Sequence, residues 1–272
     1  METVWLNEMS WIDVEEYLKT KSIIMIPIGS TEEHGPAGPL GLDTYVAIAM
    51  VEDTANQTGV ISTPPIWFGD SSHHLAFPGT ISIRTEILTE YMKDVLRSLA
   101  RHGFKNIVVV NGHKGVNLTA LQSAVRNVKE FEYQDVFFAI IDPLNIGAEA
   151  ALERETREHH AGELEISHLM YKFPTLIKKE KIPKEEPDFE GRYSKYMKTD
   201  LFKGGISIDI PWSSREQREF TKSGAMSDAS RASKEKGERY HDKMVKEMVE
   251  FIEWLKKRPD SPAPPSGPCN AL

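Results

Sequence analysis

Cysteine is almost absent from this chain: its 272 residues include only one, Cys269. No disulfide can form within the chain, and a zinc site built from cysteine thiolates is excluded. Cys269 lies in a proline-rich stretch and is badly placed for a catalytic nucleophile. Any chemistry must therefore come from other side chains.

Long apolar runs and an excess of basic residues are also missing. No segment reaches the run of about 18 apolar residues that a membrane span needs. The formal net charge of −8 argues against a nucleic-acid-binding protein. The segment Met1–Leu6 lacks a signal-peptide pattern. We therefore expect a cytoplasmic protein, with neither nucleic acid nor membrane as a partner.

Common catalytic motifs are missing as well. The sequence has no GxSxG elbow, no P-loop, no GxGxxG and no HExxH. The lack of a phosphate loop disfavours a nucleotide-binding regulator. This leaves water as the expected nucleophile.

Apolar runs that are typical of buried strands alternate with segments of helical periodicity. The predicted strands span 22–28, 59–63, 106–110 and 135–141, and the predicted helices span 43–55, 85–100, 117–130, 162–170 and 229–257. This order predicts an α/β fold, a three-layer α/β/α sandwich with a mainly parallel central sheet.

No long linker divides the chain, so residues 1–257 are interpreted as one domain. Within it, 172–217 shows little periodicity and predicts an irregular excursion that covers the active site or forms an oligomer contact. Trp212 is its expected buried anchor. Residues 258–272 are proline-rich and predict an extended or disordered tail.

Three potential metal ligands, Glu32, His34 and Asp43, follow the first predicted strand in a loop rich in glycine and proline. Open α/β folds place their chemistry at such strand ends. Carboxylate and imidazole together suit Zn, Mn or Fe, rather than Ca or Mg alone. The alternative is a set of exposed turn residues, with Asp43 as a helix cap.

Two further segments extend this ligand set. His113 follows the strand 106–110, where Gly112 permits close backbone approach and flanking asparagines can pin the loop. Glu165 opens the helix predicted at 162–170. A purely structural histidine is the alternative for His113. Together the five residues suffice for two divalent metal ions that share a bridging carboxylate.

At this point the sequence resembles the creatininase family, which comprises creatinine amidohydrolase and its relatives. The resemblance rests on GSTEEHGPAGPLGLD at 29–43, FPGT at 77–80, NGHKGVN at 111–117 and HHAGELE at 159–165, with a weaker echo at 223–228. It implies two metal positions: Glu32, Asp43 and His113 for one, and His34, Asp43 and Glu165 for the other. It also implies a homo-oligomer, specifically a hexamer.

The sequence departs from the family pattern at two positions. Creatininase itself has a metal-binding glutamate where this chain has Gly115, which argues against creatinine as the substrate and leaves Glu165 to supply that carboxylate. Glu33 replaces a glutamine common in the family. Because neighbours in an extended segment point to opposite sides, we expect Glu33 to face away from the metals.

The resemblance implies that His160 is the catalytic acid–base group, because it aligns with the histidine that plays this role in creatininase. A histidine can deliver a proton to a leaving group near neutral pH. The alternative is that His159 or His160 caps local backbone. Glu163 is interpreted as a first-turn helix carboxylate.

Four residues are expected to bind substrate: Lys114, Ser71, His74 and Trp212. Lys114 stands where the family usually has glycine or tyrosine. It either binds a polar group of the substrate or is a solvated surface lysine. Ser71 and His74 belong to a family-like segment that also holds Phe77–Thr80.

The resulting hypothesis is a hydrolase in which metal-activated water attacks a carbonyl and His160 protonates the departing atom. The same machinery serves C–N cleavage of a cyclic or small amide. It also serves C–C cleavage of a cyclic keto-inositol such as 3-dehydro-scyllo-inosose, in inositol catabolism, which is the alternative. A catalytically silent metal-binding scaffold is the second alternative.

Overall fold

A four-stranded parallel sheet forms the centre of the computed structural model, which describes residues 3–183, 196, 200–202, 208 and 210–259. The strands β1 (Ile23–Ile28), β2 (Ile61–Ser62), β3 (Asn106–Asn111) and β4 (Phe137–Ile141) lie in the order β2-β1-β3-β4, and every neighbouring pair is parallel. All residues of β1 and β3 are buried, as central strands covered on both faces must be. The predicted parallel sheet is confirmed.

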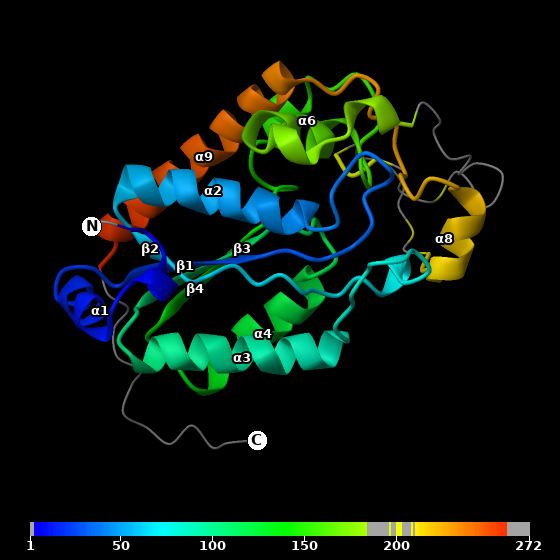
Figure 1. Cartoon of the computed structure of the whole chain (residues 1–272). Helices are drawn as coiled ribbons and strands as arrows, with labels where there is room; N and C mark the ends of the chain where they lie inside the picture. The colour runs from blue at the N-terminus through cyan, green and yellow to red at the C-terminus, as the bar shows by residue number, and fades with distance from the viewer. Residues whose placement is uncertain (1–2, 184–195, 197–199, 203–207, 209, 260–272) are drawn as a thin grey trace.

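Helices cover both faces of this sheet (Figure 1). One layer contains α2 (Leu42–Thr58), α6 (Glu163–Lys172) and α9 (Lys234–Lys257), and the other contains α3 (Thr85–Arg101) and α4 (Leu118–Phe131). The shorter helices are α1 (Trp11–Leu18), α5 (Ala148–Ala151) and α8 (Ser214–Phe220), with 3-10 turns at Leu6–Glu8, Ser72–His74, Pro174–Leu176 and Lys179–Lys181. The predicted three-layer α/β/α sandwich is therefore confirmed.

Each face of the sheet has its own hydrophobic core, because successive strand side chains point to opposite faces. In β1, Ile24 and Ile26 pack into the core beneath α3 and α4. Met25 packs with Met50 and Met244 into the core beneath α2 and α9. Two hydrophobic cores thus fix the sheet, and with it the loops that leave its strand ends.

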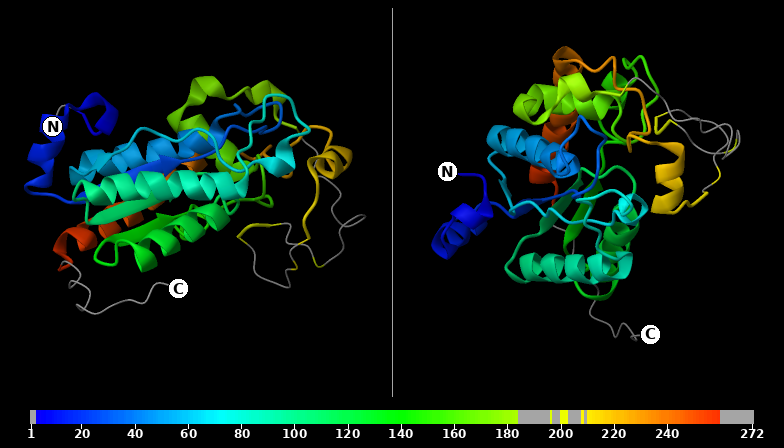
Figure 2. Two further views of the ribbon diagram at one scale, coloured as in Figure 1. Left: turned by 90° about the horizontal axis from the view of Figure 1, so that it is seen from below. Right: turned by 45° about the vertical axis from the view of Figure 1, so that its right-hand side comes forward.

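The carboxyl ends of parallel strands share one edge of the sheet. The loops after β1 and β3 run there, and α8 lies at that end while α1 lies at the other (Figures 1 and 2). This edge is where open α/β folds place their chemistry. The architecture therefore brings the predicted site segments together.

The structure adds helix α1, which the sequence did not predict, and shortens the last helix. That helix begins at Lys234 rather than near 229, because Ser233 caps it by accepting a hydrogen bond from Lys236 N at 3.3 Å. Helix α8 begins inside the segment predicted to be irregular.

Most of 184–209 and all of 260–272 lie outside the described residues, so the tail and much of the predicted excursion are among them. The assignment of 1–257 to one domain stays a prediction. In the described part of the chain, no helix is both long and apolar enough to cross a membrane.

Candidate functional site

The loop after β1 brings Glu32 and His34 beside the first turn of α2. Gly29 makes this possible, since a Cβ there would lie 2.3 Å from the backbone nitrogen of Thr44. Asp43 lies inside that first turn and Gly41 is the N-cap, so Asp43 does not cap the helix. Its carboxylate is instead 3.3 Å from Nε2 of His34.

The loop after β3 carries His113 to the same place. Asn111 donates to the His113 carbonyl at 2.6 Å and to Asp142 at 2.8 Å, and Asn117 donates to the Gly29 carbonyl at 3.0 Å. These bonds pin the loop as the sequence predicted. A Cβ at Gly112 would lie 1.9 Å from the Asp43 carbonyl, so only glycine allows this approach.

The side chains of His113, Glu32 and Glu165 lie close to Asp43. Nδ1 of His113 lies 3.1 Å from Oδ2 of Asp43, and its Nε2 lies 3.2 Å from Oε2 of Glu32. Glu165 approaches from α6, with Oε2 accepting from the backbone N–H of Ala161 at 2.8 Å. Ala161 has a φ of 54°, which reverses the chain just before the helix.

Two overlapping groups result: Glu32, Asp43 and His113 form one, and His34, Asp43 and Glu165 form the other. In each group the potential ligand atoms lie within 4.8 Å of one another. All five side chains are buried. The structure thus brings together the two ligand sets that the sequence predicted, with Asp43 shared.

The buried carboxylates of this cluster create a negative potential that favours cations. The buried Glu32 carboxylate has imidazole nitrogens of His113 and His74 at 3.2 and 3.4 Å, but neither of its oxygens accepts a hydrogen bond among the described residues, and burial raises the pKa of this group. Burial would lower the pKa of His34, but Asp43 and Glu165 raise it to about 10. Such a negative potential, with carboxylate and imidazole donors, fits divalent Zn, Mn or Fe.

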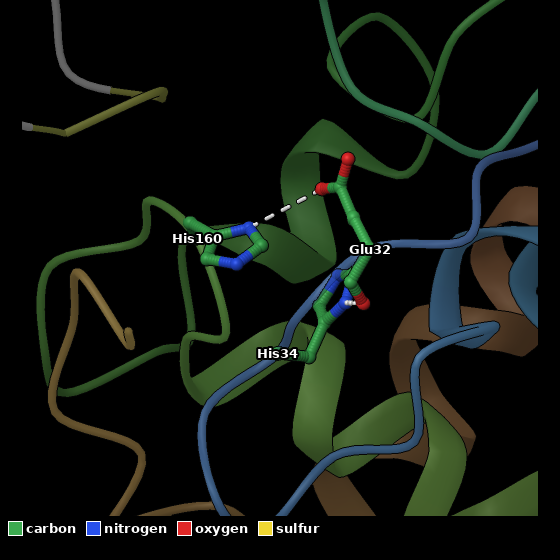
Figure 3. A group of neighbouring side chains, drawn as sticks. All are labelled: Glu32, His34 and His160. Carbon is green, nitrogen blue, oxygen red and sulfur yellow. Dashed lines mark hydrogen bonds and ion pairs between the residues drawn. The ribbon is translucent and has the colours of Figure 1, made fainter. Parts of the chain in front are cut away.

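His160 faces the cluster from the loop before α6 (Figure 3). Its Nδ1 lies 3.6 Å from Oε1 of Glu32, and its Nε2 lies 2.6 Å from the Glu33 carbonyl oxygen and 3.1 Å from Oε1 of Glu33. Burial would lower the pKa of His160, but Glu33 raises it above the usual value. Glu32, His34 and His160 also satisfy the geometry of a metal-binding group.

Glu33, which we expected to face away from the metals, belongs to neither of the two predicted ligand groups, but it does face the histidines of the site. Its carboxylate contacts His160 and lies 3.2 Å from Nδ1 of His74. Side-chain alternation applies only within a strand, whereas β1 ends at Ile28 and Gly35 turns the chain with a φ of 61°. The family-like segment 223–228 lies against Glu33. A Cβ at Gly224 would lie 2.0 Å from Oε2 of Glu33, so glycine there leaves room for the carboxylate.

Lys114 is buried rather than solvated at the surface. Its Nζ lies 3.0 Å from Oε1 of Glu165 and 3.3 Å from Oε1 of Glu158. Sequence reasoning missed Glu158, whose position directly before the HHAGELE block was the available signal. Glu163 opens α6 and accepts from Thr156 and Lys236, so it belongs to the helix start.

A cavity of about 540 Å³ opens onto the cluster. Lys114, His74, His160 and Trp212 line it together with Asp43, His113 and Glu165. Ser71 does not line it; this side chain is fully buried and its neighbour Ser72 lies at the wall instead.

Part of the cavity lining is apolar. It contains Leu201, Ile210, Trp212 and Met226, so the described end of the predicted excursion does reach the site. Trp212 packs against Met226 and is half-buried. His73 and His159 also line the cavity and were missed, although each adjoins a histidine that the sequence singled out.

Comparison with known proteins identifies the family and the relatives of this chain. The family model Creatininase, described as creatinine amidohydrolase, matches residues 7–252. The 3-dehydro-scyllo-inosose hydrolase of Thermotoga maritima is 31% identical over 191 residues, which cover 68% of this chain and 61% of that protein. The mycofactocin precursor peptide peptidase of Mycobacterium ulcerans is 34% identical over 181 residues, covering 63% and 67% respectively.

Solved structures share the fold. Creatinine amidohydrolase superposes with a TM-score of 0.78 at 22% identity, covering 95% of this chain and 100% of that one. Creatininase structures include a Zn–Zn form and a Mn form. The chain spans less than two thirds of the length of its inosose hydrolase relative. With the family match covering nearly its whole length, the chain belongs to the creatininase family.

Proposed function

We propose that this protein is a dinuclear metal-dependent hydrolase that opens a small polar, cyclic substrate by attack of activated water on a carbonyl. The bond cleaved is C–N in a cyclic or small amide, and the substrate is not creatinine itself. The observation that carries this proposal is the overlap of two ligand groups on Asp43, which lines a cavity together with His113 and Glu165.

Two divalent ions at these positions would supply a Lewis acid for the carbonyl and a nucleophilic water near neutral pH. Asp43 belongs to both groups, so it is the residue that would be shared by the two ions. Zn, Mn and Fe all suit the donors. The Zn–Zn and Mn forms of creatininase support the first two.

His160 is the group that moves a proton in this proposal. Its Nε2 is held by Glu33, so Nδ1 is the ring atom turned toward Glu32. With the proton on Nε2, Nδ1 accepts a proton from the nucleophile and passes it to the departing atom. Glu33 fixes which ring nitrogen performs this transfer.

The cavity walls favour a substrate with one polar end. Lys114 has three N–H donors, and its two carboxylate partners among the described residues leave one for a substrate oxygen. His74 offers a further polar contact. Trp212 provides an apolar face on which a ring can pack.

Gly115 supports the exclusion of creatinine. In creatininase this position holds a metal-binding glutamate, and in this chain Glu165 takes its place in the cluster. The similarity to a peptide peptidase supports cleavage of an amide bond.

A second candidate is C–C hydrolysis of a cyclic keto-inositol such as 3-dehydro-scyllo-inosose. The 31% identity to an inosose hydrolase favours it. Both reactions pass through a tetrahedral oxyanion, so the same residues serve either. Assays of the Zn and Mn forms with cyclic amides and with keto-inositols decide between them by which class is turned over.

The Glu165→Gln variant separates an enzyme from a silent scaffold. An enzyme loses turnover of its substrate while circular dichroism stays unchanged, whereas a scaffold loses only metal. Turnover at the wild-type rate in this variant would contradict the proposed role of Glu165.

We further propose a cytoplasmic homo-oligomer, a hexamer as the family resemblance implies. Light scattering on the full chain measures the assembly size. A monomer at micromolar concentration would contradict it.

A further inference from the structure

Three aromatic rings gather at the C-terminal end of α9, drawn in red in Figure 1. Phe251 and Trp254 stand three positions apart on this helix and therefore lie on one face. Their ring centres are 5.8 Å apart and their planes differ by 21°. The ring of Phe137, at the start of β4, lies 6.0 Å from that of Trp254. We call these three residues the aromatic patch. Trp254 is 51% exposed, so the patch presents apolar surface to solvent.

The aromatic patch borders an edge of the sheet. β4 is an end strand in the order β2-β1-β3-β4, and its residues 137–140 are only partly buried, whereas β1 and β3 are buried throughout. An edge strand beside exposed apolar side chains favours association with other chains, and proteins commonly cover such an edge with a further segment. This gives the patch a physical reason to be covered.

The chain passes from this patch directly into its proline-rich segment. α9 ends at Lys257, and the guanidinium carbon of Arg258 lies 4.5 Å from the centre of the Phe137 ring. Residues 260–272 lie outside the described residues and begin two positions later. From Arg258 back to Phe251 the helix axis measures about 10 Å at 1.5 Å per residue. A chain in polyproline conformation covers that distance in about four residues, at about 3.1 Å each.

The sequence of this segment suits an aromatic surface. Four of its prolines are spaced by three, at 259, 262, 265 and 268. The polyproline conformation has three residues per turn, so these four prolines would share one side. Proline-rich ligands bind aromatic-lined surfaces through such a side. Residues 261–268 carry no charged side chain, so packing them on the rings buries no charge. The run Pro-Asp-Ser at 259–261 favours a turn, which a return along α9 requires.

We propose that the proline-rich segment 259–268 turns back after α9 and covers the aromatic patch of its own chain, with its row of prolines against Trp254 and Phe251. The contact shields apolar surface beside the β4 edge. It is separate from the metal cluster and does not depend on the proposed function.

Cys269 allows a direct test, because it is the only thiol of the chain and directly follows Pro268. A nitroxide attached to Cys269 of the full-length protein reports the motion of this segment by electron paramagnetic resonance. The wild type should give the broad lines of a restrained label. Sharp lines should appear in Trp254→Leu, which keeps a good helix former in α9, and in the double variant Pro262→Ser/Pro265→Ser.

The matched control is Ser261→Ala/Ser266→Ala, which changes the same segment and keeps its prolines. Its lines should stay as broad as those of the wild type. Sharp lines in the wild type, or lines that stay broad in both Trp254→Leu and the proline variant, would overturn the inference.

A second measurement follows Trp254 itself by fluorine NMR of the full-length protein labelled with 5-fluorotryptophan, with its signal assigned from Trp254→Leu. Trp11, which is 74% exposed on α1, is the internal reference. The exposures of 51% and 74% predict that an uncovered Trp254 shows about two thirds of the shift of Trp11 between H₂O and D₂O. The wild type should fall below this ratio, and the proline variant should reach it.

An equal ratio in the wild type and the proline variant would overturn the inference. Shielding of Trp254 that disappears on dilution would do so as well, because it would assign the cover to a second copy of the chain. Neither result bears on metal content or turnover, which test the proposed function separately.

Discussion

Oε1 of Glu33 lies 3.1 Å from Nε2 of His160, on the side of the ring away from Glu32, which faces Nδ1 at 3.6 Å. A carboxylate on one ring nitrogen fixes the tautomer and orients the other nitrogen. The same arrangement serves catalytic and metal-binding histidines in many enzymes. Glu33 therefore orients His160 toward the cluster.

Glu33→Leu should lower kcat by about ten- to hundredfold, because His160 loses the group that orients it. Glu33→Gln should retain more activity, since its amide oxygen can still accept from the ring. KM should change less than kcat in both variants. Steady-state kinetics with thermal unfolding as a folding check measures this, and wild-type kcat in Glu33→Leu contradicts it.

The role of His160 can be read from metal content. If it moves a proton, His160→Ala should lower kcat by roughly 10²- to 10⁴-fold and keep the metal content of the wild type. If it is a ligand with Glu32 and His34, a geometry that the structure also permits, the variant should lose metal. Elemental mass spectrometry on the variant distinguishes the two, and we expect the metal to remain.

Asp43 is the only residue common to both predicted ligand groups. Asp43→Asn should therefore reduce both bound ions, whereas Glu32→Gln should reduce only one. Metal uptake after addition of Zn and removal of the excess measures this. Loss of the same number of ions in the two variants would show that Asp43 is not shared.

A separate histidine pair makes stability depend on pH. Nε2 of His168 lies 2.8 Å from Nδ1 of His241, and Nε2 of His241 lies 2.8 Å from Asp53, which also pairs with Lys172. Burial lowers the pKa of both histidines, and that of His168 lies well below its usual value. Lys114 on the loop after β3 adds to the effect on His168.

Proton uptake on unfolding determines whether the free energy of unfolding rises or falls with pH. The unfolded chain binds protons at these histidines near pH 6.5 while the folded chain does not, so the free energy of unfolding falls as pH decreases below about 6.5. His168→Gln, which keeps a donor for His241, should reduce this dependence by up to about 1.4 kcal/mol per pH unit. Urea unfolding of both proteins at about pH 7.5 and pH 5.5 measures it. An equally steep dependence in the variant contradicts the assignment.

The sequence predicts well those strands and helices whose pattern of apolar residues is typical of one element type only. The runs of β1 and β3 are apolar throughout because both faces are covered, and α3 shows regular helical periodicity. Helix α1 was missed because Trp11 and Ile12 are exposed at 74% and 52%, so its apolar residues do not mark one buried face. Its capping box, Ser10 with Asp13, was the available signal.

The sequence predicted the members of the cluster that directly follow a buried strand, because a carboxylate or imidazole there indicates a ligand. Glu32, His34 and His113 are of this kind. The roles of Glu33 and Glu158 were not predicted, since they depend on chain reversals at Gly35 and Ala161 that only the structure reveals. The same holds for Lys114, whose partner Glu158 lies 44 residues away in the sequence. Contacts of this kind are set by tertiary packing rather than by local pattern.

The most direct test of the central claim is the number of metal ions per chain. Elemental mass spectrometry should be applied to protein purified without chelator or nickel, both as isolated and after addition of Zn or Mn and removal of the excess. The account predicts about two equivalents after metal addition, as a site with a shared carboxylate holds. One equivalent or none, with no further uptake, would contradict the five-residue ligand set and the hydrolytic mechanism built on it.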